Sequence, residues 1–302
     1  MLAIVIPFYK INFFEENLAS LASQTNKNFN VYIGDDASPD NPEALIGTYK
    51  NMLNITYKRF DENLGGTYLT KQWDRCLDLI KEENWVILLC DDDLLSENVV
   101  EEFFKKQEEI KNSISKVVRF ATQEINEKGE KTSNIFTQPQ FQNYNDVFYS
   151  RFFGGSRSSL SEHIFSVDQY KKYGFRDLPL AWHADDLAWL EFSEFGPVYT
   201  IDEALLYFRI STINISRPNY LLKEKQEISY VFFSIVIDEY LKKFKKETIA
   251  AIIKKYELMT YAMNKGNFGF LTKFLPIFLK HFGLLESIKF SRRVFLNRKR
   301  NE

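Results

Sequence analysis

The first hundred residues alternate between short hydrophobic runs and amphipathic segments, and this alternation restricts the fold more than any other feature. Strands are predicted over 3–6, 30–34, 55–59, 85–89 and 116–121, and helices over 15–23, 42–53, 69–80 and 97–111. Strands separated by single helices at this spacing form a mostly parallel sheet with helices on both faces. Ligands of such sheets bind where the strands end.

The pattern becomes almost wholly helical towards the C-terminus. Helices are predicted over 221–243, over 246–263 and from 268 onward. We therefore expect an α/β domain over 1–217 and a helical region with a basic tail over 218–302, with the boundary near Arg217-Pro218.

The charge of the chain is unevenly distributed. It carries 39 Lys and Arg against 41 Asp and Glu, and nine of these bases but only two of these acids lie from Lys265 onward. The tail is therefore +7 and the remainder −9, which argues against nucleic acid as the partner of the main body. The basic tail is expected to meet an anionic partner.

The sequence also predicts a cellular compartment. Cys76 and Cys90 are the only cysteines, and both lie in apolar sequence, so no disulfide framework is expected. A strand-like run begins almost at once, which leaves no room for a secretion signal. No apolar stretch is expected to reach the roughly 20 residues that a membrane span needs. These features indicate a cytoplasmic protein.

Three consecutive carboxylates, Asp91, Asp92 and Asp93, follow the most hydrophobic predicted strand. Like charges this close repel one another unless a cation joins them. Mg²⁺ and Mn²⁺ bind one or two carboxylates and complete their coordination with phosphate oxygens and water. The alternative is a solvated turn whose acidic residues begin the next helix, where negative charge is favourable.

Two further segments follow predicted strands. Asp35 and Asp36 could accept hydrogen bonds from a nucleoside base or ribose, although Asp, Ser and Pro also form ordinary turns. The segment 63–66 contains paired glycines that permit close backbone approach to a ligand, and Lys71 on the next helix could meet a phosphate. An ordinary loop before a helix would have the same pattern.

A third acidic site lies far along the chain, at Asp185 and Asp186 between His183 and Trp189. An aromatic and a histidine beside a carboxylate can tune its basicity, so that it takes a proton from a hydroxyl group. The alternative is a helix N-terminus capped by aspartate.

Taken together, these segments resemble family 2 of the inverting glycosyltransferases, which have the GT-A fold. The matching segments are 4–9, 35–40, 63–66, 72–75, 91–93 (the metal-binding D-x-D), 185–186 (the base motif), 207–209 and 214–216. The resemblance covers roughly residues 1–217, and the order and spacing of the segments make it specific as a set.

The resemblance implies sugar transfer from a nucleotide-diphosphate donor, expected to be a UDP-sugar, to a glycan or lipid-linked acceptor in polysaccharide synthesis of the cell envelope. It implies Mn²⁺ or Mg²⁺ on Asp93 and Asp91, and Asp185 as the base with Asp186 in reserve. The implied donor-binding residues are Pro7, Phe8, Tyr9, Asp36, Asn63, Gly65, Lys71, Asp91 and Asp92. The loop 153–159 is expected near the acceptor.

Four positions depart from the family pattern. Lys10 stands where many members have Asn, and Ser211 stands where a His often follows Tyr-Arg. Cys90 replaces the first acidic residue of many D-x-D motifs, which moves the expected metal contact onto later aspartates. Ala184 replaces the Glu of the base motif, which makes Asp185 the better match for the base.

The C-terminal helix is predicted to have one apolar face, formed by Leu271, Phe274, Leu275, Phe278, Phe282 and Leu285. With the basic residues that follow, this face could rest on an anionic membrane, as a peripheral enzyme with a lipid-linked acceptor would require. The alternative is a helix packed on the body with a solvated basic end.

Two other functions are compatible with acidic residues on such a sheet. A nucleotidyltransferase would be expected to have a Gly-rich, basic loop after the first strand, where this chain has residues 7–10, Pro-Phe-Tyr-Lys. A non-catalytic sugar-nucleotide-binding protein would bind the donor without turnover.

Overall fold

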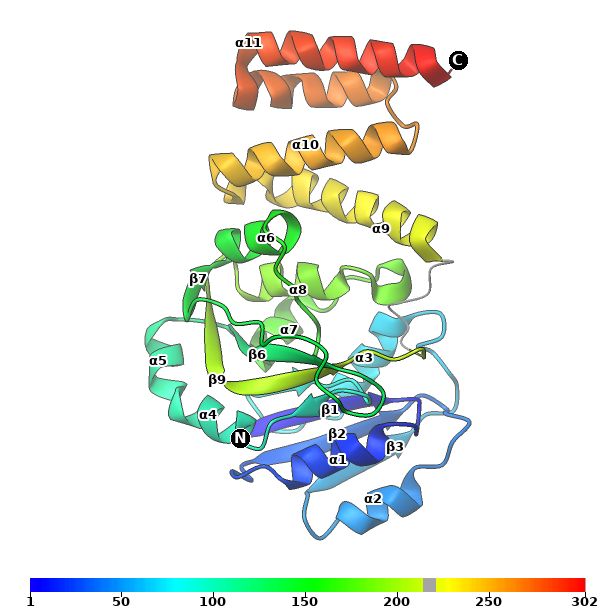
Figure 1. The fold of residues 1–302 in the computed structure, drawn as a ribbon, viewed down its shortest axis with the longest axis vertical. Coiled ribbons are helices and arrows are strands. Elements are labelled where there is room, and N and C mark those ends of the chain that lie inside the picture. Colours follow the sequence, from blue (N-terminus) through cyan, green and yellow to red (C-terminus); the bar gives the residue numbers. More distant parts are fainter. Residues whose placement is uncertain (214–220, 302) are drawn as a thin grey trace. The chain divides into compact units, whose positions relative to one another are not determined.

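The computed structural model describes residues 1–213 and 221–301, with side chains to Asn297, and confirms the predicted mixed α/β architecture (Figure 1). Contacts divide the chain into two compact units, Met1–Tyr220 and Leu221–Glu302. The predicted boundary at Arg217 and the predicted closing segment 214–216 lie outside the described residues.

Four parallel strands form the first part of the sheet. They are β1 (Leu2–Phe8), β2 (Phe29–Asp35), β3 (Ile55–Arg59) and β4 (Trp85–Leu88). β1 lies between β2 and β4, and β3 pairs with β2. Phe8 lies beside Asp35 in this register, so β1 and β2 end together and their following residues meet at one edge.

The second part of the sheet mixes strand directions. Its strands are β5 (Leu94–Leu95), β6 (Val117–Ile125), β7 (Phe141–Asn143), β8 (His163–Ser166) and β9 (Pro197–Arg209). The order is β3-β2-β1-β4-β8-β6-β9-β5, with β7 pairing with β9, and β8 runs antiparallel to both of its neighbours. Because β5 pairs with the end of β9, Arg209 comes close to the turn that follows β4.

The helices of this unit are α1 (Phe14–Ala22), α2 (Glu43–Tyr49), α3 (Leu69–Leu77), α4 (Val99–Lys105), α5 (Gln107–Asn112), α6 (Tyr144–Phe153), α7 (Val167–Tyr173) and α8 (Ala184–Phe192). The predicted helix over 97–111 is two helices, because Lys106 has a non-helical backbone. α2 ends four residues earlier than predicted, and the amides of Met52 and Leu53 both donate to the carbonyl of Tyr49 in the turn that follows.

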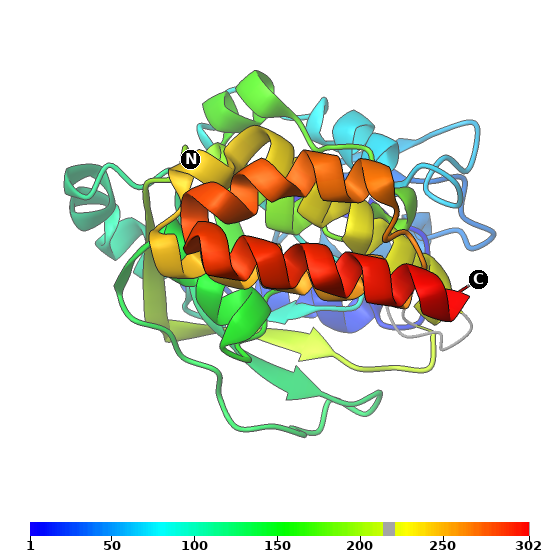
Figure 2. The same ribbon diagram turned by 90° about the horizontal axis from the view of Figure 1, so that it is seen from above.

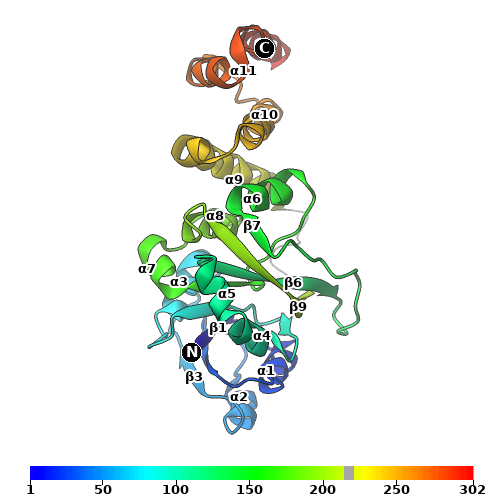
Figure 3. The same cartoon turned by 90° about the vertical axis from the view of Figure 1, so that its left-hand side faces the viewer.

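The alternation of side chains along β1 explains why helices cover both faces of the sheet. Leu2, Ile4, Ile6 and Phe8 belong to one core cluster with Phe14, Leu18 and Leu21 of α1. α3 contacts β1 and β2, and Figure 3 shows α1 and α3 on opposite sides of the sheet. The contact between α3 and β2 is tight, because a Cβ added at Gly34 would lie 2.3 Å from Cys76 Sγ.

The second unit is helical, as predicted. It contains α9 (Leu222–Ile235), a π turn (Val236–Tyr240), a short 3-10 turn (Leu241–Lys243), α10 (Lys246–Ala262) and α11 (Phe268–Asn301). α11 folds back on itself at Gly283, whose φ of 81° favours glycine, so that two helical arms lie side by side (Figure 2).

By length and composition alone, 268–297 is one helix apolar enough to cross a membrane, contrary to the expectation that no stretch would qualify. The fold at Gly283 leaves a first arm of about 22 Å, however, and the hydrocarbon core of a bilayer is about 30 Å thick. The structure therefore contains a hairpin of two short helices at this place rather than one long helix.

Half of the predicted apolar face of α11 is internal. Leu271, Phe274 and Phe278 are buried within the unit, and the ring of Phe274 stacks on Tyr256 of α10 at 5.1 Å. For these side chains the packed alternative is correct. Leu275 and Leu285 of the predicted face are exposed, together with apolar side chains of α11 that were not predicted.

The close approach at Gly34 yields a stability prediction. Gly34→Ala should destabilise the protein by about 1–3 kcal/mol, because the new methyl group overlaps the side chain of Cys76. Gly47→Ala is the matched control: it lies in α2 with no atom within 4 Å of the added Cβ, and should stabilise by about 0.5–1 kcal/mol. Urea unfolding measures both, and equal effects would contradict the packing described.

Candidate active site

The ends of β1, β2 and β4 bring three predicted segments together. The amides of Tyr9 and Lys10 both donate to Asp91 Oδ2 at 2.9 Å. The amide of Asp36 donates to the carbonyl of Phe8 at 3.0 Å. The segments after the three strands are thus joined by direct hydrogen bonds.

The side chain of Asp36 forms its contacts within the protein. Its buried carboxylate accepts the amides of Leu64 at 2.7 Å and Gly65 at 2.9 Å, and it pairs with Arg75. A Cβ at Gly65 would lie 2.6 Å from Asp36 Oδ2, which explains the glycine. Asn63 closes the same loop by accepting the amide of Gly66 at 2.7 Å. Asp36 therefore holds the 63–66 loop in place.

The other predicted donor-binding residues differ in what they can offer to a ligand. The side chain of Phe8 is fully buried against Phe14, with ring centroids 4.6 Å apart, so it cannot reach a ligand. Pro7 is partly buried. Tyr9 and Lys71 have exposed side chains, and Lys71 lies 3.8 Å from Asp74 of the same helix.

The turn Cys90–Asp93, which we call the acidic turn, is held by two distant elements. Asn17 Nδ2 of α1 donates to the carbonyls of Cys90 at 3.0 Å and Asp93 at 2.7 Å. Arg209 at the end of β9 donates from Nε to the carbonyl of Asp92 at 3.0 Å and from its amide to Asp93 Oδ1 at 3.0 Å. The backbone of the turn is therefore fixed.

Arg209 is fully buried although it carries a charge. Its guanidinium also donates to the carbonyls of Asn126 and Glu127, pairs with Glu16 at 2.6 Å, and lies 4.4 Å from the ring centroid of Phe13. Such a network compensates for the desolvation of the charge. Sequence alone marks Arg209 as part of the 207–209 match but reveals neither this role nor that of Asn17.

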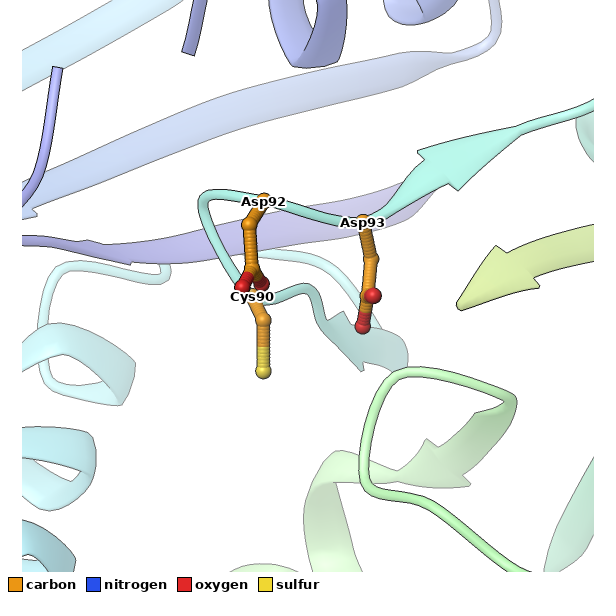
Figure 4. Close-up of side chains that lie close together, drawn as sticks. All are labelled: Cys90, Asp92 and Asp93. Carbon is orange, nitrogen blue, oxygen red and sulfur yellow. The ribbon is translucent and has the colours of Figure 1, made fainter. Parts of the chain in front are cut away.

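The acidic turn presents a group of ligand atoms. Cys90 Sγ and one carboxylate oxygen each of Asp92 and Asp93 lie within 4.8 Å of one another, and Figure 4 shows the three side chains projecting to the same side of the turn. Asp93 Oδ2 is buried and has no hydrogen-bond partner of regular geometry among the described residues, although Ser161 lies near enough to oppose the rise in the pKa of Asp93 that burial causes. An orphaned buried carboxylate oxygen is costly unless a cation meets it.

The electrostatics of the turn support the same conclusion. Burial raises the pKa of Asp93 to about 6, and burial together with the charges of Asp93 and Asp91 raises the pKa of Asp92 to about 8. Burial also raises the pKa of the Cys90 thiol, which keeps it neutral and a weak ligand. Two crowded carboxylates fit a divalent cation that prefers oxygen ligands. Asp91, predicted as a ligand, instead accepts the two amides described above.

The pair at the start of α8 has two different environments. Asp186 accepts a hydrogen bond from Arg151 Nε at 3.1 Å and lies 2.7 Å from His183 Nδ1. Burial opposes ionisation of Asp186, but Arg151 and His183 outweigh it and lower its pKa to about 2. Burial and the charge of Asp186 raise the pKa of Asp185 to about 7. Asp185 can therefore exchange a proton near neutral pH, whereas Asp186 stays ionised.

The backbone before α8 is strained. Leu180, Ala181 and His183 all have positive φ values, of 58°, 50° and 67°. Non-glycine residues rarely adopt this conformation, which costs about 1–3 kcal/mol each and is concentrated at functional sites. The strain sets the direction in which α8 begins and so the position of Asp185.

The loop after α6 couples electrostatically to both acidic sites. Glu162 accepts Ser159 Oγ at 2.7 Å and pairs with Arg157 at 3.3 Å. Burial raises the pKa of both Asp93 and Glu162, and the charge of Arg157 opposes the rise at each of them, while the charge of Arg151 also opposes it at Glu162. A series of alternating charges thus runs from the acidic turn towards α8. Sequence predicts a role for the loop 153–159, which contains Arg157, but offers no signal for the ion pair of Arg157 with Glu162.

Comparisons agree with this architecture. The profile of Glycosyl transferase family 2 matches residues 3–165, just over half of the chain. No match was found among curated proteins. Among solved structures, residues 1–349 of S. aureus TarS in complex with UDP-GlcNAc match with a TM-score of 0.64 at 17% identity, covering 90% of this chain and 75% of that chain.

The same part of TarS in complex with UDP matches with a TM-score of 0.61 at 17% identity, covering 83% of this chain and 70% of that chain. A longer S. aureus TarS structure matches with a TM-score of 0.62 at 16% identity, covering 86% of this chain and 43% of that one. At such low identity these similarities establish a shared GT-A fold.

The crowding in the acidic turn predicts a pH-dependent stability. Folding raises the pKa of Asp92 above its ordinary value of 3.8, so ionisation should progressively destabilise the metal-free protein from about pH 4 to about pH 8. Asp92→Asn should therefore raise the metal-free melting temperature at pH 8 by about 2–4 °C. It should also reduce the stabilisation by Mn²⁺.

Thermal melts at pH 5 and pH 8, with and without Mn²⁺, measure these effects. Asp61→Asn is the matched control, because it removes the same charge from an exposed position. Equal stabilisation of both variants by Mn²⁺ would contradict a cation site at the acidic turn.

Proposed function

The chain belongs to Glycosyl transferase family 2 and is a glycosyltransferase; we propose that it transfers a sugar from a UDP-sugar to a glycan or lipid-linked acceptor with inversion. The observation that carries the proposal is the contrast between two carboxylate sites. The acidic turn has an unsatisfied buried oxygen on Asp93, and Asp185 has a pKa near neutrality. The UDP-GlcNAc and UDP complexes of TarS support a UDP-linked donor.

On the donor side, Asp92 and Asp93 would hold Mn²⁺ or Mg²⁺ beside the diphosphate of the donor. When bound, the cation supplies charge neutralisation for the leaving diphosphate. Arg209 and Asn17 keep the turn in its binding geometry. Asp91 fixes the backbone after β1 by accepting two of its amides.

The nucleoside would lie against the ends of β1 and β2. The exposed side chain of Tyr9 can contact it, and Lys71 can contact a phosphate. Asp36 holds the amides of Leu64 and Gly65, and Asn63 holds the amide of Gly66, in the loop whose backbone lines this edge.

On the acceptor side, Asp185 would remove the proton of an acceptor hydroxyl as its oxygen attacks the anomeric carbon. The new bond forms on the face opposite the diphosphate, and the bond from the anomeric carbon to the diphosphate oxygen breaks with its electron pair. The proton ends on Asp185, and the configuration is inverted. Arg151 and His183 hold the side chain of Asp186, whose amide donates to Asp185 Oδ1 at 2.9 Å and so helps to position it.

The family membership speaks against a nucleotidyltransferase, since such an enzyme would form pyrophosphate from a nucleoside triphosphate rather than release UDP from a UDP-sugar. A non-catalytic binding protein would bind the donor equally well with Asp185 or with Asn at this position, and neither form would turn the donor over.

We propose that the enzyme acts in the cytoplasm, at the inner face of the membrane, in polysaccharide synthesis of the cell envelope.

The role of Asp185 predicts a catalytic defect without a binding defect. Asp185→Asn should lower UDP release from a UDP-sugar in the presence of Mn²⁺ by about 10²–10⁴-fold, because a general base contributes that much. Donor binding measured by calorimetry should be unchanged. Asp185→Glu should retain part of the activity, and full activity of Asp185→Asn would contradict the assignment.

The shifted pKa of Asp185 predicts the pH profile of kcat. Activity requires the ionised carboxylate, so kcat should rise with pH through about 7. Arg151 lowers the pKa of Asp185, so Arg151→Met should move this limb to higher pH. A limb that stays in place or moves to lower pH would contradict the proposed electrostatics.

A further inference from the structure

The helical hairpin of α11 is held together by an internal aromatic face. The rings of Phe278 and Phe290, one from each arm, stack with centroids 4.0 Å apart. Phe270 of the first arm contacts Phe290 at 5.5 Å, and Val294 of the second arm is also buried. This face accounts for the folding of the hairpin and leaves its outer side chains unexplained.

The outer side of the hairpin is also apolar. Its exposed large side chains are Phe268, Leu275, Leu279, Leu284, Leu285, Ile288, Phe295 and Leu296, and their exposed fractions range from 37% to 75%. Leu279, Leu284, Leu285 and Ile288 fall within ten residues around the fold at Gly283 and are each more than half exposed. Helices that are apolar on every side are buried or lie in a membrane, and such patches mark interaction surfaces.

The charge around this surface identifies the partner. Residues 268–297 contain five Lys and Arg but only one acidic residue, Glu286. Lys273, Lys289 and Arg293 pair with acidic residues of the unit. Lys280 and Arg292 are exposed and have no ion-pair partner among the described residues. This positive surface is complementary to anionic lipid headgroups, whereas a second copy would bring like charges together.

We infer that the α11 hairpin, residues 268–297, binds the surface of an anionic membrane and inserts its tip, residues 279–288, among the headgroups and upper acyl chains. The first arm is too short to cross a bilayer, and the second carries Glu286, Lys289, Arg292 and Arg293, so the hairpin lies on one leaflet. The inserted side chains overlap the predicted face only in part, because Leu271, Phe274 and Phe278 of that face are buried within the unit whereas Leu285 is 75% exposed. The inference rests on the proposed function in one respect, that a lipid-linked acceptor would be found at this surface.

Flotation of the full chain with vesicles tests the inference. We expect binding to vesicles of phosphatidylglycerol and phosphatidylcholine, and weaker binding to phosphatidylcholine alone. The variant Leu284→Ser/Leu285→Ser/Ile288→Ser should lose binding by at least about a hundredfold, since each buried apolar side chain contributes about tenfold. Lys280→Gln/Arg292→Gln should weaken binding to the anionic vesicles only.

The matched control is Leu222→Ser/Val231→Ser/Leu258→Ser, which removes three exposed apolar side chains from α9 and α10 of the same unit. It should bind vesicles as the unchanged protein does. Circular dichroism verifies that both triple variants are folded, and sedimentation reports their oligomeric state.

Failure of the unchanged protein to float, or equal flotation of the tip variant, overturns the inference. A dimer that dissociates in the tip variant, without vesicle binding, assigns the surface to a second copy and also overturns it. UDP release is measured separately without vesicles and should be the same in all of these variants. Loss of vesicle binding therefore leaves sugar transfer standing, and absence of UDP release leaves membrane binding standing.

Discussion

The candidate site depends on the hydrogen bonds that the buried Arg209 makes to the acidic turn. Three adjacent carboxylates would separate if the backbone between them were free to rearrange. Arg209 and Asn17 bond to the carbonyls of the acidic turn, and the amide of Arg209 holds one oxygen of Asp93. Because the turn is fixed, the carboxylates cannot move apart to relieve their repulsion. Binding of a cation between them would relieve it instead.

The aspartates of the site have the same chemistry but different tasks, and their surroundings decide which. Asp36 and Asp91 accept backbone amides and so connect segments that follow different strands. Asp186 is buried, but Arg151 and His183 outweigh the effect of burial, lower its pKa and keep it ionised. Asp93 and Asp185 have raised pKa values because burial is not offset by comparable cations. Carboxylates with structural partners thus alternate along the chain with the two for which reactive roles are proposed.

Sequence predicts the parallel half of the sheet and the acidic segments after its strands, because strand periodicity and residue type are local signals. It does not distinguish Asp91 from Asp93, because their partners, Tyr9 and Arg209, are 82 and 116 residues away. The hairpin of α11 is missed for a related reason. Both faces of its helices are apolar, so periodicity cannot tell the inner face from the outer one, and one glycine reverses the chain.

The central claim is that the acidic turn binds a divalent cation together with the diphosphate of the donor. Crystals grown with Mn²⁺ and UDP test it most directly, through the anomalous scattering of manganese. The account predicts one strong peak about 2.0–2.2 Å from carboxylate oxygens of Asp93 or Asp92, with the diphosphate on its other side. A nucleotide bound at this edge with manganese elsewhere, or with none beside the acidic turn, would contradict it.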